Sequence, residues 1–102
     1  MPRFVKVCRA DAVAEGAVML VDADGTKVAL CRRAGQLFAL SNFCPHLTGN
    51  LGEGKLDGDE LVCPEHFWRF KLGTGRCVNV PGQSAHAFPV RLDDDGWALV
   101  GV

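Results

Sequence analysis

The chain has 102 residues, eleven of them basic and twelve acidic, which gives a net charge of −1. A chain of this length has room for one domain with a single core, so we expect one domain over residues 1–102. The balanced charge excludes the sequence-independent attraction that brings strongly basic proteins to nucleic acid.

The N-terminal segment MPRFVKVCRADAVAEG mixes charged and apolar residues, so it predicts neither a signal peptide nor a membrane anchor. We therefore expect a cytoplasmic protein that contacts no membrane. The run RFVKV predicts a first strand. In the following DAVAEG, Asp11 is suited to cap a single helical turn and Gly16 to end it.

The rest of the chain predicts short antiparallel strands. Residues 22–25 and 93–96 each end in Asp-Gly between apolar runs, a pair that tolerates the positive φ of tight hairpins. A third turn is expected at Ala34-Gly35. No segment has a sustained helical period, so the pattern predicts an all-β fold, with strands in the runs KVALC, QLFAL, RFKL, FPVRL and WALV.

Three of the five cysteines, Cys8, Cys31 and Cys77, stand apart with no common spacing. An odd number of cysteines does not suit the disulfide framework of a secreted protein. We expect these three to be reduced and to behave as small apolar core residues.

The segment from Cys44 to His66 carries the chemistry. It contains Cys44 and His46 as C-x-H, sixteen intervening residues, and Cys63 and His66 as C-x-x-H. Such a set closes a tetrahedral zinc site, or holds a two-iron cluster in which histidines replace two cysteines on one iron. Structural zinc sites usually take one ligand type from each loop, whereas each loop here supplies both. The mixture favours the cluster and leaves a zinc-stabilised binding module as the alternative.

The two loops resemble the cluster-binding loops of Rieske proteins. The matching stretches are CPHLTGNLGEG, which begins at Cys44, and CPEHFWRFKLGTG, which begins at Cys63, and GRCVNVPG is similar to the family's proline-containing cover loop. The resemblance implies an all-β Rieske (ISP-domain) fold, with antiparallel sheets that support a small tip subdomain at about residues 42–80. It also implies that one 2Fe-2S cluster is held in this tip by Cys44, His46, Cys63 and His66.

The departures from the family pattern indicate which class of Rieske protein the chain resembles. Rieske subunits of respiration and photosynthesis have a further cysteine in each loop, and those positions are Gly49 and Glu65 here. They also place hydroxyl groups against the sulfurs, where this chain has Trp68 and Phe70. Only His86 remains beyond the expected ligands, too few for the mononuclear iron site of an oxygenase, and we expect a structural role for it.

The chain thus resembles the Rieske ferredoxins of bacterial aromatic-ring-hydroxylating dioxygenase systems. The resemblance implies an electron-transfer component, not an enzyme, placed between a flavoprotein NAD(P)H-dependent ferredoxin reductase and a terminal Rieske oxygenase. No G-x-G-x-x-G opens a helix after a strand, so no flavin or nicotinamide domain is expected in this sequence. A carrier for another monooxygenase and the small subunit of a nitrite reductase remain alternatives.

Two expectations concern the surface of the tip. Five acidic residues are either a solvated face or a means of steering basic partners; they are Glu53, Asp57, Asp59, Glu60 and Glu65. Family members commonly have glycine after the second histidine, where this chain has Phe67, which suggests an apolar docking contact.

Two further expectations concern the surroundings of the cluster. We expect Trp68 to pack in the core, and the amides of Leu47, Phe67 and Trp68 are candidates to donate hydrogen bonds to sulfur.

The missing hydroxyl donors predict a low reduction potential. A hydrogen bond to a charged group contributes about 1.5–3 kcal/mol, so two missing bonds lower the potential by roughly 130–250 mV. We expect a midpoint near the low end of the range of about −150 to +300 mV that Rieske centres span. A redox titration of the purified protein measures it, and a midpoint well above zero would contradict the prediction.

Overall fold

The computed structural model describes residues 2–43, 50–65 and 67–102. These residues form ten β-strands and two short 3-10 helices, and none of them forms a helix that is long and apolar enough to cross a membrane. In chain order the elements are β1 (Phe4–Arg9), η1 (Ala10–Ala12), β2 (Val18–Ala23), β3 (Thr26–Arg33), β4 (Gln36–Ser41), η2 (Leu51–Glu53), β5 (Lys55–Asp57), β6 (Glu60–Val62), β7 (Arg69–Lys71), β8 (Ala87–Phe88), β9 (Val90–Leu92) and β10 (Trp97–Gly101).

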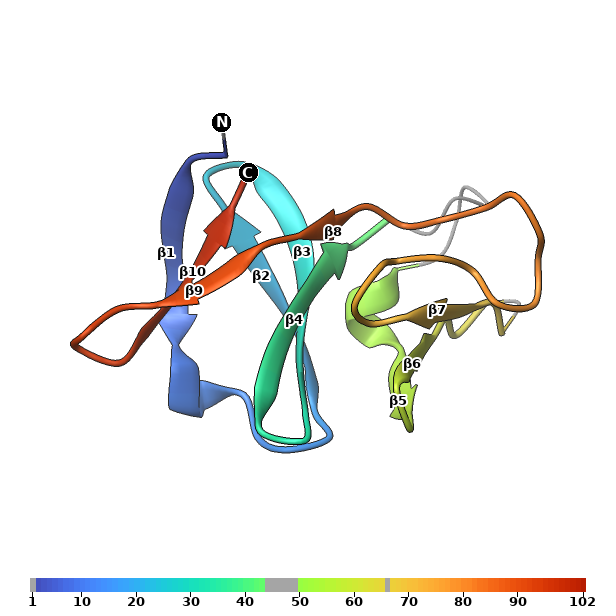
Figure 1. Cartoon of the computed structure of the whole chain (residues 1–102), viewed down its shortest axis with the longest axis horizontal. Coiled ribbons are helices and arrows are strands. Elements are labelled where there is room, and N and C mark those ends of the chain that lie inside the picture. Colours follow the sequence, from blue (N-terminus) through green and yellow to red (C-terminus); the bar gives the residue numbers. More distant parts are fainter. Residues whose placement is uncertain (1, 44–49, 66) are drawn as a thin grey trace.

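The described strands form three antiparallel sheets. Their orders are β1-β10-β9, β2-β3-β4-β8 and β5-β6-β7. Figure 1 shows the first two sheets together as a base and the third standing to one side of it. The all-β, antiparallel prediction is confirmed. The third sheet falls inside the predicted tip at residues 42–80, whose boundaries stay a prediction.

Strand β3 belongs to the base, and it is buried on both faces, one of which packs against the third sheet. Successive side chains of a strand point to opposite faces of the sheet. Val28 and Leu30 accordingly lie in a core cluster with residues of β10, and Ala29 and Cys31 lie in a second cluster with residues of β6 and β7. Both clusters consist of side chains removed from water, the main favourable contribution to folding. The alternation along one strand therefore seats the third sheet on the base.

The chain leaves and re-enters the base at neighbouring points. The amide of Ser41, at the end of β4, donates to the carbonyl oxygen of His86 at 2.8 Å. Beside this hydrogen bond β4 and β8 form an antiparallel pair, with Leu40 opposite Ala87. Everything between residues 42 and 86, including the third sheet, is thus inserted between two adjacent strands.

The three predicted hairpin turns are confirmed. Asp24 and Gly25 have φ values of 54° and 94°, and Ala34 and Gly35 have φ values of 53° and 78°. Two successive left-handed residues match the right-handed twist of the strands that they connect. The turn at 93–96 joins β9 to β10 and has a left-handed conformation at Gly96, with φ of 88°.

A long-range contact supports the second turn, and the sequence did not indicate it. The carboxylate of Glu15 accepts hydrogen bonds from the amides of Gly35 at 2.8 Å and Ala34 at 2.6 Å. These two backbone hydrogen bonds hold the pKa of Glu15 below its usual value.

The prediction of a helical turn capped by Asp11 was partly wrong. The turn is the 3-10 helix η1, Asp11 lies inside it, and no side chain caps it. Gly16 is left-handed as expected, with φ of 79°.

The isolated cysteines are core residues, as predicted. Cys31 and Cys77 are buried, whereas Cys8 is half-buried and packs against the cluster below the first sheet. Burial raises the pKa of the Cys31 thiol to about 12, so this group stays protonated at neutral pH. The thiol donates to the carbonyl oxygen of Phe38 at 3.6 Å.

Gly75 offers a test of how closely the segment after β7 packs on the chain that returns to the base. Gly75 has φ of 78°, and a Cβ atom there would lie 1.8 Å from the carbonyl oxygen of Ala85. Gly75→Ala combines a left-handed alanine with a backbone clash, so we expect a loss of about 2–5 kcal/mol in the free energy of unfolding. Gly73→Ala is the matched control, because a Cβ at Gly73 meets nothing within 4 Å. Denaturant unfolding measures both, and equal midpoints for the two variants would contradict the prediction.

Candidate metal centre

Of the four predicted ligands, the structure describes Cys63. The other three, Cys44, His46 and His66, lie outside the described residues. Among residues 2–43, 50–65 and 67–102 there is no group of three or more His, Cys, Asp or Glu side chains placed to hold a metal ion. The complete ligand set therefore stays a prediction, and the described residues show how its surroundings are built.

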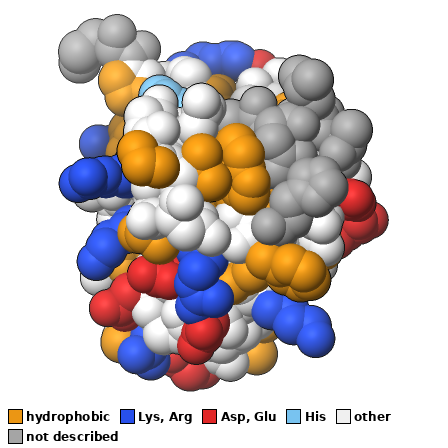
Figure 2. All heavy atoms as spheres, turned by 90° about the vertical axis from the view of Figure 1, so that its right-hand side faces the viewer, with side chains coloured by type: hydrophobic (Ala, Val, Ile, Leu, Met, Phe, Trp, Pro, Cys, Tyr) orange, Lys and Arg blue, Asp and Glu red, His pale blue; other side chains and the backbone are white. Residues whose placement is uncertain are grey.

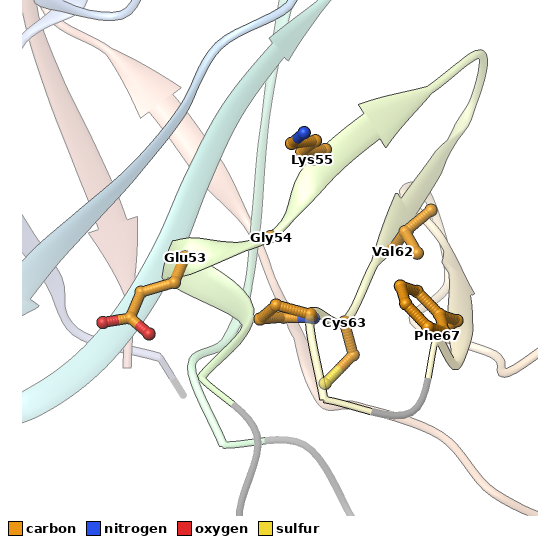
Figure 3. Close-up of a pocket in the computed structure, with 7 residues that line it drawn as sticks. Glu53, Gly54, Lys55, Val62, Cys63 and Phe67 are labelled. Carbon is orange, nitrogen blue, oxygen red and sulfur yellow. The ribbon is translucent and has the colours of Figure 1, made fainter.

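Cys63 follows directly on β6, and its side chain has 0% exposure. It belongs to the second core cluster, with Leu61 and Phe70. It also lines an open pocket of about 260 Å³ together with Val62, Pro64, Phe67 and residues 53–55. Figure 3 shows the Cys63 sulfur directed away from Val62 and Phe67.

These surroundings fit an iron–sulfur cluster at the one ligand that is described. Such clusters are held by cysteine thiolates, and solvent exposure is one of the factors that set their potential. The side chain of Cys63 is shielded from water at the end of a short strand, and the strand is itself anchored in the core. Thiolate donors combined with imidazole donors form the donor set of the Rieske type.

The second ligand loop is a closed turn. The amide of Phe67 donates to the carbonyl oxygen of Cys63 at 3.1 Å, and the amide of Cys63 donates to the carbonyl oxygen of Trp68 at 2.8 Å. Phe67 has φ of 60°, a left-handed conformation that costs a residue other than glycine about 1–2 kcal/mol. Because the Phe67 amide is used within the turn, its predicted hydrogen bond to sulfur is not supported; Leu47, predicted to donate in the same way, lies outside the described residues.

The first ligand loop is closed at its base by Asn42, a buried polar residue that the sequence analysis did not identify. Its side chain, in a residue only 3% exposed, donates to Oδ1 of Asn50 at 3.0 Å and accepts from the amide of Gly52 at 2.8 Å. Its carbonyl oxygen accepts from the amide of Leu51 at 2.7 Å. Phe43 and Asn50 also form a β-bridge. The two described ends of this loop are thus held together by backbone and side-chain hydrogen bonds.

Local ion pairs use most of the acidic residues of the tip. Arg69 pairs with Asp57, and its Nε lies 2.6 Å from Oε1 of Glu60. These two carboxylates raise the pKa of Arg69 above its usual value. Asp59 pairs with Arg33 at 3.3 Å. Three of the five carboxylates are therefore paired locally, which reduces the charge available to steer basic partners, and steering stays a prediction.

Apolar side chains flank the ligand loops instead. Phe43 is 62% exposed, Phe67 is 67% exposed and Val78 is 40% exposed. Figure 2 shows apolar side chains across the middle of the face that carries the tip, with many of the charged side chains below them. Trp68, in contrast, is half-buried against the second core cluster, as predicted.

His86 has the structural role expected of it. Its ring packs edge-on against Phe88, with 4.6 Å between the ring centroids, and its carbonyl oxygen binds the end of β4. Its position at the return of the chain to the base explains these contacts.

Comparison with known proteins places this geometry in a family. The ferredoxin component of the naphthalene 1,2-dioxygenase system of Pseudomonas aeruginosa is 36% identical to the chain over 82 residues, 79% of each sequence. The ferredoxin of carbazole 1,9a-dioxygenase from Nocardioides aromaticivorans IC177 has a TM-score of 0.88 and 30% identity, and the match covers 96% of both chains. A chain from the complex of reduced oxygenase and oxidized ferredoxin in carbazole 1,9a-dioxygenase has a TM-score of 0.87 and 31% identity, covering 96% of this chain and 92% of that one.

These relatives are ferredoxin components of multicomponent oxygenase systems, which confirms the prediction of an electron carrier in place of a catalytic enzyme. The protein-family model that describes the Rieske [2Fe-2S] domain matches residues 3–92 of the chain. This match supports one Rieske-type 2Fe-2S cluster as the cofactor, in place of the alternative zinc ion. The chain belongs to the Rieske [2Fe-2S] domain family.

Proposed function

We propose that the chain carries one electron from a flavoprotein NAD(P)H-dependent reductase to a terminal aromatic-ring-hydroxylating dioxygenase. The observation that carries the proposal is the match to dioxygenase ferredoxins along most of both chains, including one from a complex with its oxygenase. The apolar residues around the ligand loops support it, because a carrier needs a surface that partners contact and release in turn.

The proposed ligands are Cys44, His46, Cys63 and His66. When bound, the cluster supplies reversible one-electron oxidation and reduction. The protein contributes the shielding of Cys63 from water and the two loops that are closed at their bases. Two neutral imidazoles in place of two thiolates make the cluster less negative, which favours its reduction.

The proposal includes a cytoplasmic location and a single Rieske domain over residues 1–102 with its tip at about 42–80. The location is supported by Cys8, Cys31 and Cys77, which are present as free thiols, and by the NAD(P)H that the proposed reductase consumes. Pairing of β1 near the N-terminus with β10 near the C-terminus supports the domain assignment.

The role as carrier is tested by reconstitution. The cluster-loaded protein is combined with NADH, a ferredoxin reductase and the oxygenase of an aromatic dioxygenase system. The ferredoxin of that system is left out of the mixture. We expect NADH oxidation and formation of the dihydrodiol product only when the chain is present. Electron transfer to a monooxygenase or a nitrite reductase, but to no aromatic dioxygenase tested, would contradict the proposed acceptor.

The ligand assignment is tested at the described ligand. Cys63→Ser replaces a soft thiolate with a hydroxyl, so we expect loss of the red-brown colour and of nearly all bound iron and sulfide. Cys8→Ser is the control, because Cys8 lies in the base, and it should retain the cluster. Iron and sulfide analysis measures both variants, and a Cys63→Ser protein with full iron content would refute the assignment.

A further inference from the structure

Phe67 stands in a conformation that its own side chain does not explain. Its φ of 60° is left-handed, a region that residues without a Cβ adopt freely and others do not. Its ring is 67% exposed, so burial of the ring contributes little to holding the backbone. The ring does lie beside Val62 at the pocket, which is one partial support (Figure 3).

Hydrogen bonds occupy both polar backbone groups of Phe67. Its amide donates to the carbonyl oxygen of Cys63 at 3.1 Å, inside the second ligand loop. Its carbonyl oxygen accepts from Nδ2 of Asn79 at 3.1 Å, from outside the loop. The second bond ties the loop to a segment that follows β7 in the chain.

Asn79 is itself held in a fixed orientation. Its Oδ1 accepts from the amide of Arg69 at 3.0 Å and from the thiol of Cys77 at 3.3 Å. Cys77 is buried, and the amide of Val78 donates to the carbonyl oxygen of Arg69 at 2.8 Å. With its oxygen held by these two donors, the side chain has only its NH2 group left to meet Phe67.

We propose that Asn79 is a positioning residue for the second ligand loop. Its amide holds Phe67 in the left-handed conformation and thereby keeps closed the turn that begins at Cys63. The inference rests on the proposed function, because it takes Cys63 and His66, which precede Phe67 in the sequence, as ligands of the cluster. It assigns the role to a side chain sixteen residues beyond Cys63 in the sequence.

The test compares the rate at which variants lose the cluster. One hydrogen bond of this kind corresponds to about a 3–10-fold change in an equilibrium or a rate. We expect Asn79→Ala to lose its visible absorbance about 3–10-fold faster than the unchanged protein in the presence of an iron chelator. Gln83→Ala is the matched control, because Gln83 is an exposed amide in the same segment with no side-chain hydrogen bond among the described residues, and it should not change the rate.

A double-mutant cycle with Phe67→Gly separates positioning from general stabilisation. Glycine adopts the left-handed conformation without the clamp, so Asn79→Ala should change the rate by less than about 2-fold in the Phe67→Gly protein. If Asn79 only stabilised the fold, Asn79→Ala would change the rate of cluster loss by the same factor in the unchanged protein and in the Phe67→Gly protein. Equal effects of Asn79→Ala in the two backgrounds would overturn the proposal.

The rate of cluster loss in Asn79→Asp gives a second test of the proposal. This variant retains an oxygen for Arg69 and Cys77 but places an acceptor against the carbonyl oxygen of Phe67, so cluster loss should be at least as fast as in Asn79→Ala. Unchanged cluster loss in this variant would show that the amide donor is not needed. Circular dichroism of each variant checks that the fold is retained. Failure of the proposed function has a different signature: electron transfer to the dioxygenase would be absent in the reconstitution, while the rates of cluster loss in these variants would be unaffected.

Discussion

The structure depends on the burial of strand β3 on both faces. Val28 and Leu30 pack towards the sheet that contains β10, and Ala29 and Cys31 pack towards the third sheet, in a cluster that also contains Cys63. Because the side chains alternate strictly along a strand, a shift of one residue in register would exchange the two sets. The position of the third sheet relative to the base therefore depends on the pairing of β3 with its two neighbours, β2 and β4.

The features that the sequence predicted well are local. The turns at Asp24-Gly25 and Ala34-Gly35 depend on residues that tolerate positive φ, and adjacent residues determine them. The cysteine and histidine pairs are recognisable in the sequence because ligand chemistry restricts both residue type and spacing, and their role as ligands stays a prediction. Cys31 and Cys77 were expected in the core from the ordinary behaviour of a free thiol.

The features that escaped prediction are contacts between distant parts of the chain. Glu15 binds the amides of the turn at Ala34 and Gly35, about twenty residues away, and no local pattern indicates this pairing. Asn42 and Asn79 are single polar residues whose roles depend on which backbone groups the fold brings near them. The ion pairs of the acidic residues in the tip escaped prediction for the same reason, because Arg69 and Arg33 reach them only after folding.

The chain enters the tip from β4 and returns on β8, which is paired with β4, so the two junctions lie side by side. An excursion with adjacent ends places little demand on the geometry of its host, a condition under which whole segments are exchanged between proteins without disturbing the rest of the fold. Residues 42–86, which include the four proposed ligands, thus form an insertion whose two ends are adjacent in the base. Any block that replaces residues 42–86 must still supply apolar side chains in the places of Leu61 and Phe70, because these cover Ala29 and Cys31 of β3.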